Sequence, residues 1–268
     1  MERAELAEAI DMPIVLNGLK TVDNLINKHL GNCPKQLQKL TLETVKSGKR
    51  LRPTLTLISA SMANKDYSRE VLDAAVVIEL IHKASTLHDS VMDNKMSPKQ
   101  VGEALLAGDY LLSKSLKLAA TINSQTVTRA SDCINTMIDG ETMQARSRYR
   151  AIPTSQYYIQ TISKKTASLY ELACELGGQF SNQSQSSIDS LKSYGCYFGI
   201  AFQLADDLFD QDLPKSHHPA AKVKINDYIE KARQAIVDLD SPTAKAGLLK
   251  IQEAYFKVPP LLDDQKLL

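Results

Sequence analysis

The residues best suited to chemistry in this sequence are three aspartates and a glutamine inside an apolar stretch. Gln203, Asp206 and Asp210 are spaced so that they share one face of a helix, and Asp207 lies beside them. Burying three carboxylates among apolar neighbours is costly unless cations compensate their charge. Carboxylates at this spacing suit Mg²⁺, which typically takes one or two of them together with phosphate oxygens of a substrate. The alternative is an exposed helix end with solvated acids.

A second polar stripe lies within residues 71–94, a stretch that is apolar on most sides and therefore predicts a buried helix. His82, Ser85, Asp89 and Asp93 follow one another at helical spacing, which keeps them within one narrow stripe. Polar groups on a buried helix predict an interior polar surface. Two such helices in one chain favour a metal-binding cavity over two solvated helix ends.

Cations for a bound diphosphate are available in two places. Lys49, Arg50 and Arg52 lie in a turn before an expected helix, and Lys165 and Thr166 lie on an apolar helical stretch. A solvated basic turn and a lysine that reaches out to the surface are the alternatives. Together with the acidic stripes, these residues predict a helical cavity with acids at its mouth and cations beside them.

Composition narrows the class of protein. The 268 residues are 43% hydrophobic, and 32 Lys and Arg balance 31 Asp and Glu, so no broad basic surface for nucleic acid is expected. The four cysteines are far apart without a C-x-x-C pair, which argues against structural zinc and fits reduced thiols in a cytoplasmic protein. No stretch approaches about 18 uncharged apolar residues, so no transmembrane segment is expected.

The elements that must position these side chains are expected to be long helices, because both polar stripes lie in long proline-free windows. Ser68 is expected to cap the first of these helices. Gly177-Gly178 and the polar residues after them are expected to break the second window before a helix over 187–210. No repeat, linker or composition shift divides the chain. We therefore expect a single all-α domain over residues 1–268, a bundle of long helices around a deep central cavity.

In their order along the chain, these segments resemble the trans-type isoprenyl diphosphate synthases, or polyprenyl synthetases. The match runs through GKRLRP, ELIHKASTLHDSVMD, ALLAGDYLL, DGE, KKTASLYELACELGG and FGIAFQLADDLFD. The resemblance implies the isoprenoid synthase fold, in which two aspartate-rich motifs on facing helices bind Mg²⁺ ions that grip the diphosphate of an allylic prenyl diphosphate. Loss of that diphosphate leaves an allylic cation, which the double bond of isopentenyl diphosphate attacks before a proton is lost.

The resemblance also implies a role for each matching residue. The implied metal ligands are Asp89, Asp93, Asp206, Asp207 and Asp210. The residues implied to act on the leaving diphosphate are Lys165 and Thr166, with Gln203 one turn before the second motif. The residues implied to bind isopentenyl diphosphate are Lys49, Arg52 and His82.

The chain departs from the family pattern in three places. The first motif reads Asp89-Ser90-Val91-Met92-Asp93, so a hydroxyl replaces its middle carboxylate. The arginine pair expected after this motif is absent, and Lys95 or Lys99 would replace it only in part because a lysine lacks the bidentate fork. The segments near 95–101 and 212–226 are short for the family.

These departures leave more than one function open. The resemblance implies a chain-elongating prenyltransferase, active as a homodimer or as a heterodimer with a related subunit. The lost arginine pair, Ser90 and the shortened C-terminal third motivate the alternative of a non-catalytic or regulatory subunit in a heteromeric prenyl diphosphate synthase. A class I terpene synthase is a third possibility, and Lys49, Arg52 and His82 count against it because such an enzyme needs no isopentenyl diphosphate site.

Product length in this family depends on the bulk of the side chains below the first motif. One turn before Asp89 these are Ala84 and Ser85, and small side chains leave room for a growing chain. The resemblance therefore implies products beyond C15, on the order of C20 or longer, because an aromatic side chain there would overlap the growing chain. The alternative is that Ala84 and Ser85 are simply small residues in a close helix contact.

Overall fold

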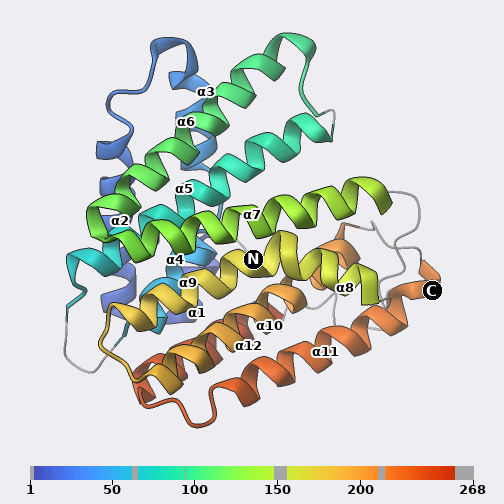
Figure 1. Ribbon diagram of the computed structural model, residues 1–268. Coiled ribbons are helices and arrows are strands. Elements are labelled where there is room, and N and C mark those ends of the chain that lie inside the picture. Colours follow the sequence, from blue (N-terminus) through green and yellow to red (C-terminus); the bar gives the residue numbers. More distant parts are fainter. Residues whose placement is uncertain (1–2, 62–65, 94, 148–155, 211–214, 257–268) are drawn as a thin grey trace.

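The computed structural model describes residues 3–61, 66–93, 95–147, 156–210 and 215–256 (Figure 1). Within these ranges the chain forms helices joined by short connections and no strand, which confirms the all-α prediction. The α-helices in chain order are α1 (Arg3–Ile10), α2 (Pro13–His29), α3 (Lys35–Lys46), α4 (Leu51–Ser59), α5 (Arg69–Met92), α6 (Pro98–Ile122), α7 (Ser124–Ser147), α8 (Gln156–Ile162), α9 (Ser168–Gln179), α10 (Gln185–Phe209), α11 (His218–Ala235) and α12 (Pro242–Phe256). A π-helical turn, η1 (Ser163–Ala167), joins α8 to α9, and a 3₁₀ turn, η2 (Lys215–His217), precedes α11.

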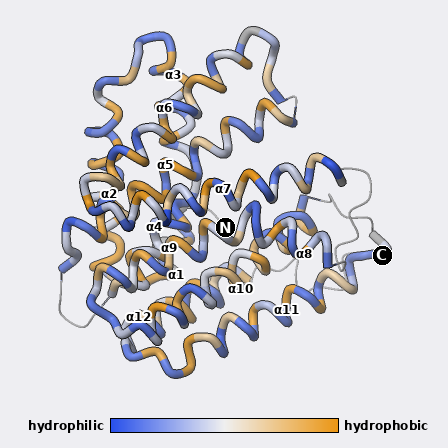
Figure 2. Tube along the Cα trace, in the orientation of Figure 1, coloured by the Kyte–Doolittle hydropathy of each residue, from blue (hydrophilic) through white to orange (hydrophobic). Residues whose placement is uncertain are grey.

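The centre of the bundle is formed by α4, α5, α9 and α10. Helix α9 packs against α4, α5 and α10, while α6 and α11 cover the outer sides of α5 and α10. Hydrophobic residues recur along all of these helices (Figure 2). One apolar cluster contains buried side chains from Leu6 in α1 to Phe256 in α12.

Helix α5 matches its prediction closely. The Ser68 side chain accepts a hydrogen bond from the backbone N–H of Val71, and the helix continues to Met92. Its middle, from Ala74 to Ile78, is fully buried, as expected for a helix that is apolar on most sides. The predicted end at Asn94 lies outside the described residues.

The boundary between α9 and α10 differs from the prediction. Gly177 and Gly178 lie inside the last turn of α9, which ends at Gln179, and α10 begins at Gln185 behind the N-cap Ser184. A Cβ atom on Gly177 would lie 2.3 Å from the carbonyl oxygen of Thr56. The pair therefore allows α9 to approach α4 closely, and the polar residues after it end the helix.

This contact gives a stability prediction. Gly177→Ala is expected to lower the free energy of unfolding by about 1–3 kcal/mol, because the new methyl group overlaps the backbone of α4. The matched control is Gly102→Ala in α6, where nothing lies within 4 Å of the new Cβ. Gly102→Ala is expected to raise the free energy of unfolding by about 0.5–1 kcal/mol, because alanine favours the helix more than glycine does. Urea denaturation measures both, and equal effects of the two substitutions would contradict the close contact.

No helix in the described ranges is both long enough and apolar enough to cross a lipid bilayer.

Candidate functional site

The two acidic stripes are linked through the π-helical turn η1. Helix α9 and η1 pack against α10, and α9 also packs against α5. Helices α5 and α10 both end on the right-hand side of Figure 1, and their aspartates lie at those ends. A π-helical turn accommodates one extra residue and is frequent at functional sites. In η1 the neighbouring side chains Lys165 and Thr166 reach different acidic helices.

Lys165 connects to the first acidic motif. Its Nζ lies 3.8 Å from Oδ2 of Asp89 and forms a closer ion pair with Glu141 of α7. Burial raises the pKa of the Asp89 carboxyl above its ordinary value. Lys165 opposes this shift, whereas the nearby carboxylates of Glu141 and Asp93 add to it. The first motif is thus a crowded acidic group, in which Lys165 is the cation beside Asp89.

Thr166 connects to the second acidic motif through a chain of hydrogen bonds. Its hydroxyl donates to Oε1 of Gln203 over 2.8 Å, and Nε2 of Gln203 donates to Oδ1 of Asp207 over 2.6 Å. The Tyr158 hydroxyl donates to the other oxygen of Asp207. Both Asp207 oxygens therefore accept hydrogen bonds from protein groups, which holds this carboxylate in one orientation.

Both acidic motifs lie at helix C-terminal ends. Asp93 is the C-cap of α5 and Asp210 is the C-cap of α10, and each backbone N–H donates to the carbonyl of the aspartate four residues earlier, over 2.8 and 2.9 Å. The C-terminal end of a helix carries partial negative charge, so carboxylates there are unfavourable without cations. This placement suits a site that takes up positive charge.

The donor set fits Mg²⁺, since carboxylate oxygens are the ligands this ion prefers. Asp89, Asp93, Asp206, Asp207 and Asp210 could supply them. In the described part of the chain, no three His, Cys, Asp or Glu side chains converge on one ion position.

Cationic and aromatic side chains lie next to the second motif. The guanidinium of Arg52 lies 4.3 Å from the ring centre of Tyr170, and Nζ of Lys49 lies 6.0 Å from that of Tyr255. Burial raises the pKa of the Tyr255 phenol, and the nearby carboxylates of Asp206 and Asp210 add to the shift. The cations of the basic turn and the acids of α10 therefore gather around the same two tyrosines.

His82 of α5 lies near Arg52. The residue is half-buried, and burial lowers the pKa of the imidazole well below its ordinary value. The neighbouring cations Arg52, Lys83 and Arg50 lower it further. His82 is therefore neutral at pH 7 and can both donate and accept a hydrogen bond.

Arg50 does not belong to the site, contrary to the expectation that the basic turn supplies three cations. Its side chain is 3% exposed and donates to Asp23, to Glu79 and to the backbone carbonyls of Val45 and Ser47. The other two cations of this segment, Lys49 just before α4 and Arg52 in its first turn, are the ones beside Tyr255 and Tyr170. Arg50 has a left-handed backbone (φ 62°) at the N-cap of α4.

The small residues Ala84 and Ser85 lie on α5 about one turn before Asp89. Ala84 is 2% exposed, and the Ser85 hydroxyl donates to the carbonyl of His82 over 2.8 Å.

The Ser90 hydroxyl donates to the carbonyl of Thr86 over 2.8 Å, so it bonds within its own helix. After the motif, Nζ of Lys95 pairs with Asp93 over 3.2 Å, while the side chain of Lys99 lies outside the described residues.

Two residues near the acidic motifs were missed by sequence reasoning. Glu141 contacts Lys165, and Tyr158 contacts Asp207. Glu141 lies in the D-G-E match, which carried no assigned chemistry, and nothing in the sequence around Tyr158 distinguishes it. Both come from helices other than those that carry the acidic motifs.

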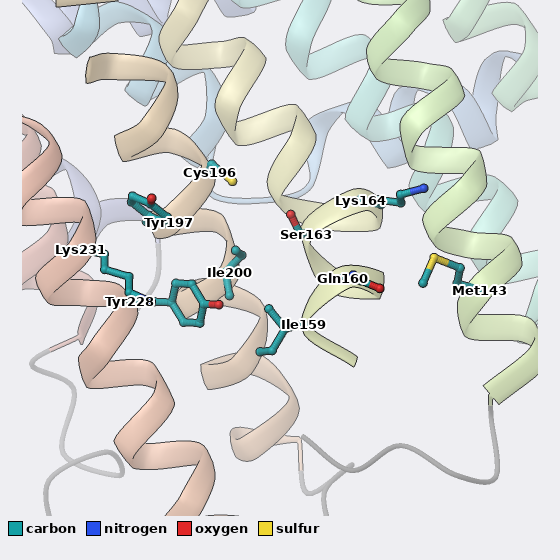
Figure 3. A pocket seen from close by; sticks show the side chains of 10 residues that line it. All are labelled: Met143, Ile159, Gln160, Ser163, Lys164, Cys196, Tyr197, Ile200, Tyr228 and Lys231. Atoms are coloured by element: carbon teal, nitrogen blue, oxygen red, sulfur yellow. The ribbon is translucent and has the colours of Figure 1, made fainter. Parts of the chain in front are cut away.

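A cavity of about 570 Å³ lies beside η1 (Figure 3). It is lined by residues of α7, α8, η1, α10 and α11, and Ile159, Ile200 and Tyr228 lie close together in its wall (Figure 3). Ser163 and Lys164 of η1 line this cavity, whereas Lys165 and Thr166 contact the acidic motifs. The aspartates themselves do not line it.

Comparison with known proteins identifies the family. Residues 34–237 match the family model of the polyprenyl synthetases. The chain is 31% identical over 218 residues to a nonaprenyl diphosphate synthase of Mycobacterium tuberculosis, covering 78% of this chain and 65% of the relative. It is 32% identical over 173 residues to heptaprenyl diphosphate synthase component 2 of Bacillus subtilis, covering 61% and 49%. The chain spans about two thirds or less of the length of the curated relatives it matches.

Solved structures share the architecture. Geranylgeranyl pyrophosphate synthase from Corynebacterium glutamicum superposes with a TM-score of 0.82 at 22% identity, covering 97% of this chain and 99% of that one. A decaprenyl diphosphate synthase from Rhodobacter capsulatus superposes with a TM-score of 0.78 at 22% identity, covering 96% and 99%. The chain therefore belongs to the polyprenyl synthetase family and has the all-helical isoprenoid synthase fold.

Proposed function

We propose that this chain is a Mg²⁺-dependent prenyltransferase that condenses isopentenyl diphosphate with an allylic prenyl diphosphate into a longer trans-polyprenyl diphosphate. The observation that carries the proposal is the connection between the acidic motifs. Lys165 contacts Asp89, and its neighbour Thr166 reaches Asp207 through Gln203. A cation and a hydroxyl between two acidic helix ends suit a diphosphate held by metal ions.

Each group then has a role that follows from its surroundings. Asp89 and Asp93 on one side, and Asp206, Asp207 and Asp210 on the other, would hold Mg²⁺. The bound ions would supply positive charge that stabilises the departing diphosphate. Lys165 and Thr166 would contact the same diphosphate, and Gln203 would orient Asp207. The proposed isopentenyl diphosphate site consists of Lys49, Arg52 and neutral His82.

The alternative is a non-catalytic or regulatory subunit of a heteromeric prenyl diphosphate synthase. Ser90 supplies no carboxylate, and its hydroxyl is bonded to its own helix. One relative is named as component 2 of a heptaprenyl diphosphate synthase, which is a statement about that protein. The test is an assay of the purified chain with Mg²⁺, farnesyl diphosphate and labelled isopentenyl diphosphate, with and without candidate partner subunits. Product without a partner supports the enzyme, and product only with a partner supports the subunit.

We further propose that residues 1–268 form one domain that acts in the cytoplasm. The shared apolar cluster from α1 to α12 supports one domain. Free thiols at all four cysteines are compatible with a reducing compartment.

Dimer formation is expected through the outer faces of α6 and α7. Leu105 and Leu106 of α6 and Ile138 of α7 are large apolar side chains exposed to solvent, and the two helices pack together. Light scattering at micromolar concentration should give the mass of a dimer, and Leu106→Glu should shift it toward a monomer. Exposed Val223→Glu on α11 is the control and should leave the mass unchanged. If the wild-type protein were a monomer in this measurement, the predicted interface would be wrong.

Product length provides a further prediction. Ala84→Phe or Ser85→Phe should shorten the products, since steric overlap in a packed interior costs about 1–3 kcal/mol. Thr86→Phe is the control, because Thr86 is exposed on the same helix. Product chromatography decides the question. Wild-type protein that stops at C10 or C15, or a Phe variant with unchanged products, would show that the chain meets other residues first.

A further inference from the structure

Helix α7 contacts the π-helical turn through three consecutive residues, Asp139, Gly140 and Glu141. Asp139 pairs with Lys164 over 3.3 Å, and Glu141 pairs with Lys165. Between them, a Cβ atom on Gly140 would lie 2.3 Å from the backbone nitrogen of Lys165. Glycine at this position therefore lets α7 lie directly against the backbone of the turn.

The two ion pairs differ in their surroundings. The side chains of Asp139 and Lys164 are 67% and 43% exposed, and an ion pair this exposed to solvent contributes little to stability. Those of Glu141 and Lys165 are only 21% and 23% exposed. The second pair therefore holds its lysine in a fixed place, whereas the first is largely screened by water.

Lys165 is shared between two carboxylates, and they do not hold it equally. Its Nζ lies closer to Glu141 than to Asp89, which is 3.8 Å away. If the Lys165 ammonium formed a close ion pair with Asp89, it would occupy that carboxylate. The ammonium would then be less available to a bound diphosphate. Glu141 draws the ammonium away from this position.

We propose that Glu141 is a positioning residue that holds Lys165 between the first acidic motif and the bound diphosphate. The inference rests on the proposed function, because it assigns Asp89 to metal and Lys165 to diphosphate. Glu141 acts through Lys165 and contacts neither substrate. When the charge of Glu141 is removed, the Lys165 ammonium pairs with Asp89 instead. Neither group is then available to the metal ions or to the diphosphate.

The test compares two substitutions that remove the same charge from neighbouring positions of α7. Calorimetry measures the affinity of the purified full chain for inorganic pyrophosphate in the presence of Mg²⁺. Glu141→Gln is expected to weaken binding about tenfold, the lower end of the losses found when residues behind a metal site are changed. Asp139→Asn is expected to change it by less than about twofold, because its pair is exposed. Glu141→Asp keeps the charge and should retain more affinity than Glu141→Gln.

A double-substitution cycle separates positioning from a direct or purely structural role. If Glu141 acts through Lys165, the Glu141→Gln/Lys165→Met double variant binds pyrophosphate as Lys165→Met alone does. Additive losses would overturn the inference, as would equal binding by wild-type protein and Glu141→Gln. Unfolding midpoints of all variants are measured in parallel, and a loss of affinity that merely tracks a loss of stability also overturns it. Wild-type protein that binds no pyrophosphate with Mg²⁺ would instead overturn the proposed function, and this inference with it.

Discussion

Asp206→Ala is expected to remove most Mg²⁺-dependent diphosphate binding, with a loss of about 100-fold or more, since even residues behind a metal site cost up to this much. Asp206 lies in the motif that retains all three carboxylates, and it lies near Tyr170, Tyr255 and the cations of the basic turn. The C-terminal end of α10 carries partial negative charge, so its carboxylates attract cations strongly. Removing Asp206 takes away part of the negative charge that attracts the metal ions. The remaining carboxylates would hold metal ions more weakly.

The measurement is calorimetric titration of inorganic pyrophosphate with and without Mg²⁺. Asp189→Ala is the matched control, because Asp189 is an exposed aspartate on the same helix and lies far along it from the motif. This variant should bind as the wild type does. Ser90→Asp restores the missing carboxylate of the first motif and should strengthen binding or leave it unchanged. Equal pyrophosphate affinity with and without Mg²⁺ would refute a metal-dependent site.

Arg50→Met is expected to destabilise the fold by about 3–5 kcal/mol, because it leaves a buried carboxylate without its main partner. The Glu79 side chain is 2% exposed and accepts a hydrogen bond from Arg50 over 2.8 Å. Lys83 lies 3.7 Å from the same carboxylate, and burial lowers the pKa of its ammonium, so it compensates only in part. Two backbone carbonyls also lose their donor.

Urea denaturation of Arg50→Met measures this loss, with Lys46→Met on the exposed face of α3 as the control. The control should change the free energy of unfolding by less than about 0.5 kcal/mol. The Arg50→Met/Glu79→Met double variant should recover part of the stability, because it removes the unpaired buried charge. A loss below about 1 kcal/mol for Arg50→Met would mean that water or Lys83 satisfies Glu79.

The sequence by itself determined the helices that carry the acidic motifs. Helix α5 is apolar nearly all round, so its course and burial follow from its composition, and Ser68 marks its start. Helical spacing also places Asp206 and Asp210 on one face of α10. Both observations depend on local sequence alone, because the period of a helix fixes which of its residues share a face.

The tertiary structure alone decided how these faces meet other elements. Arg50 and Arg52 look equivalent in the sequence, yet Arg50 turns into the core to pair with Glu79, while Arg52 lies over Tyr170. Glu141 reaches Lys165 only because Gly140 lets α7 approach η1. Helical periodicity says nothing about which distant helix packs against a given face, since that depends on side-chain volumes along the whole interface. The partners of the site residues were therefore visible only once the helices had packed.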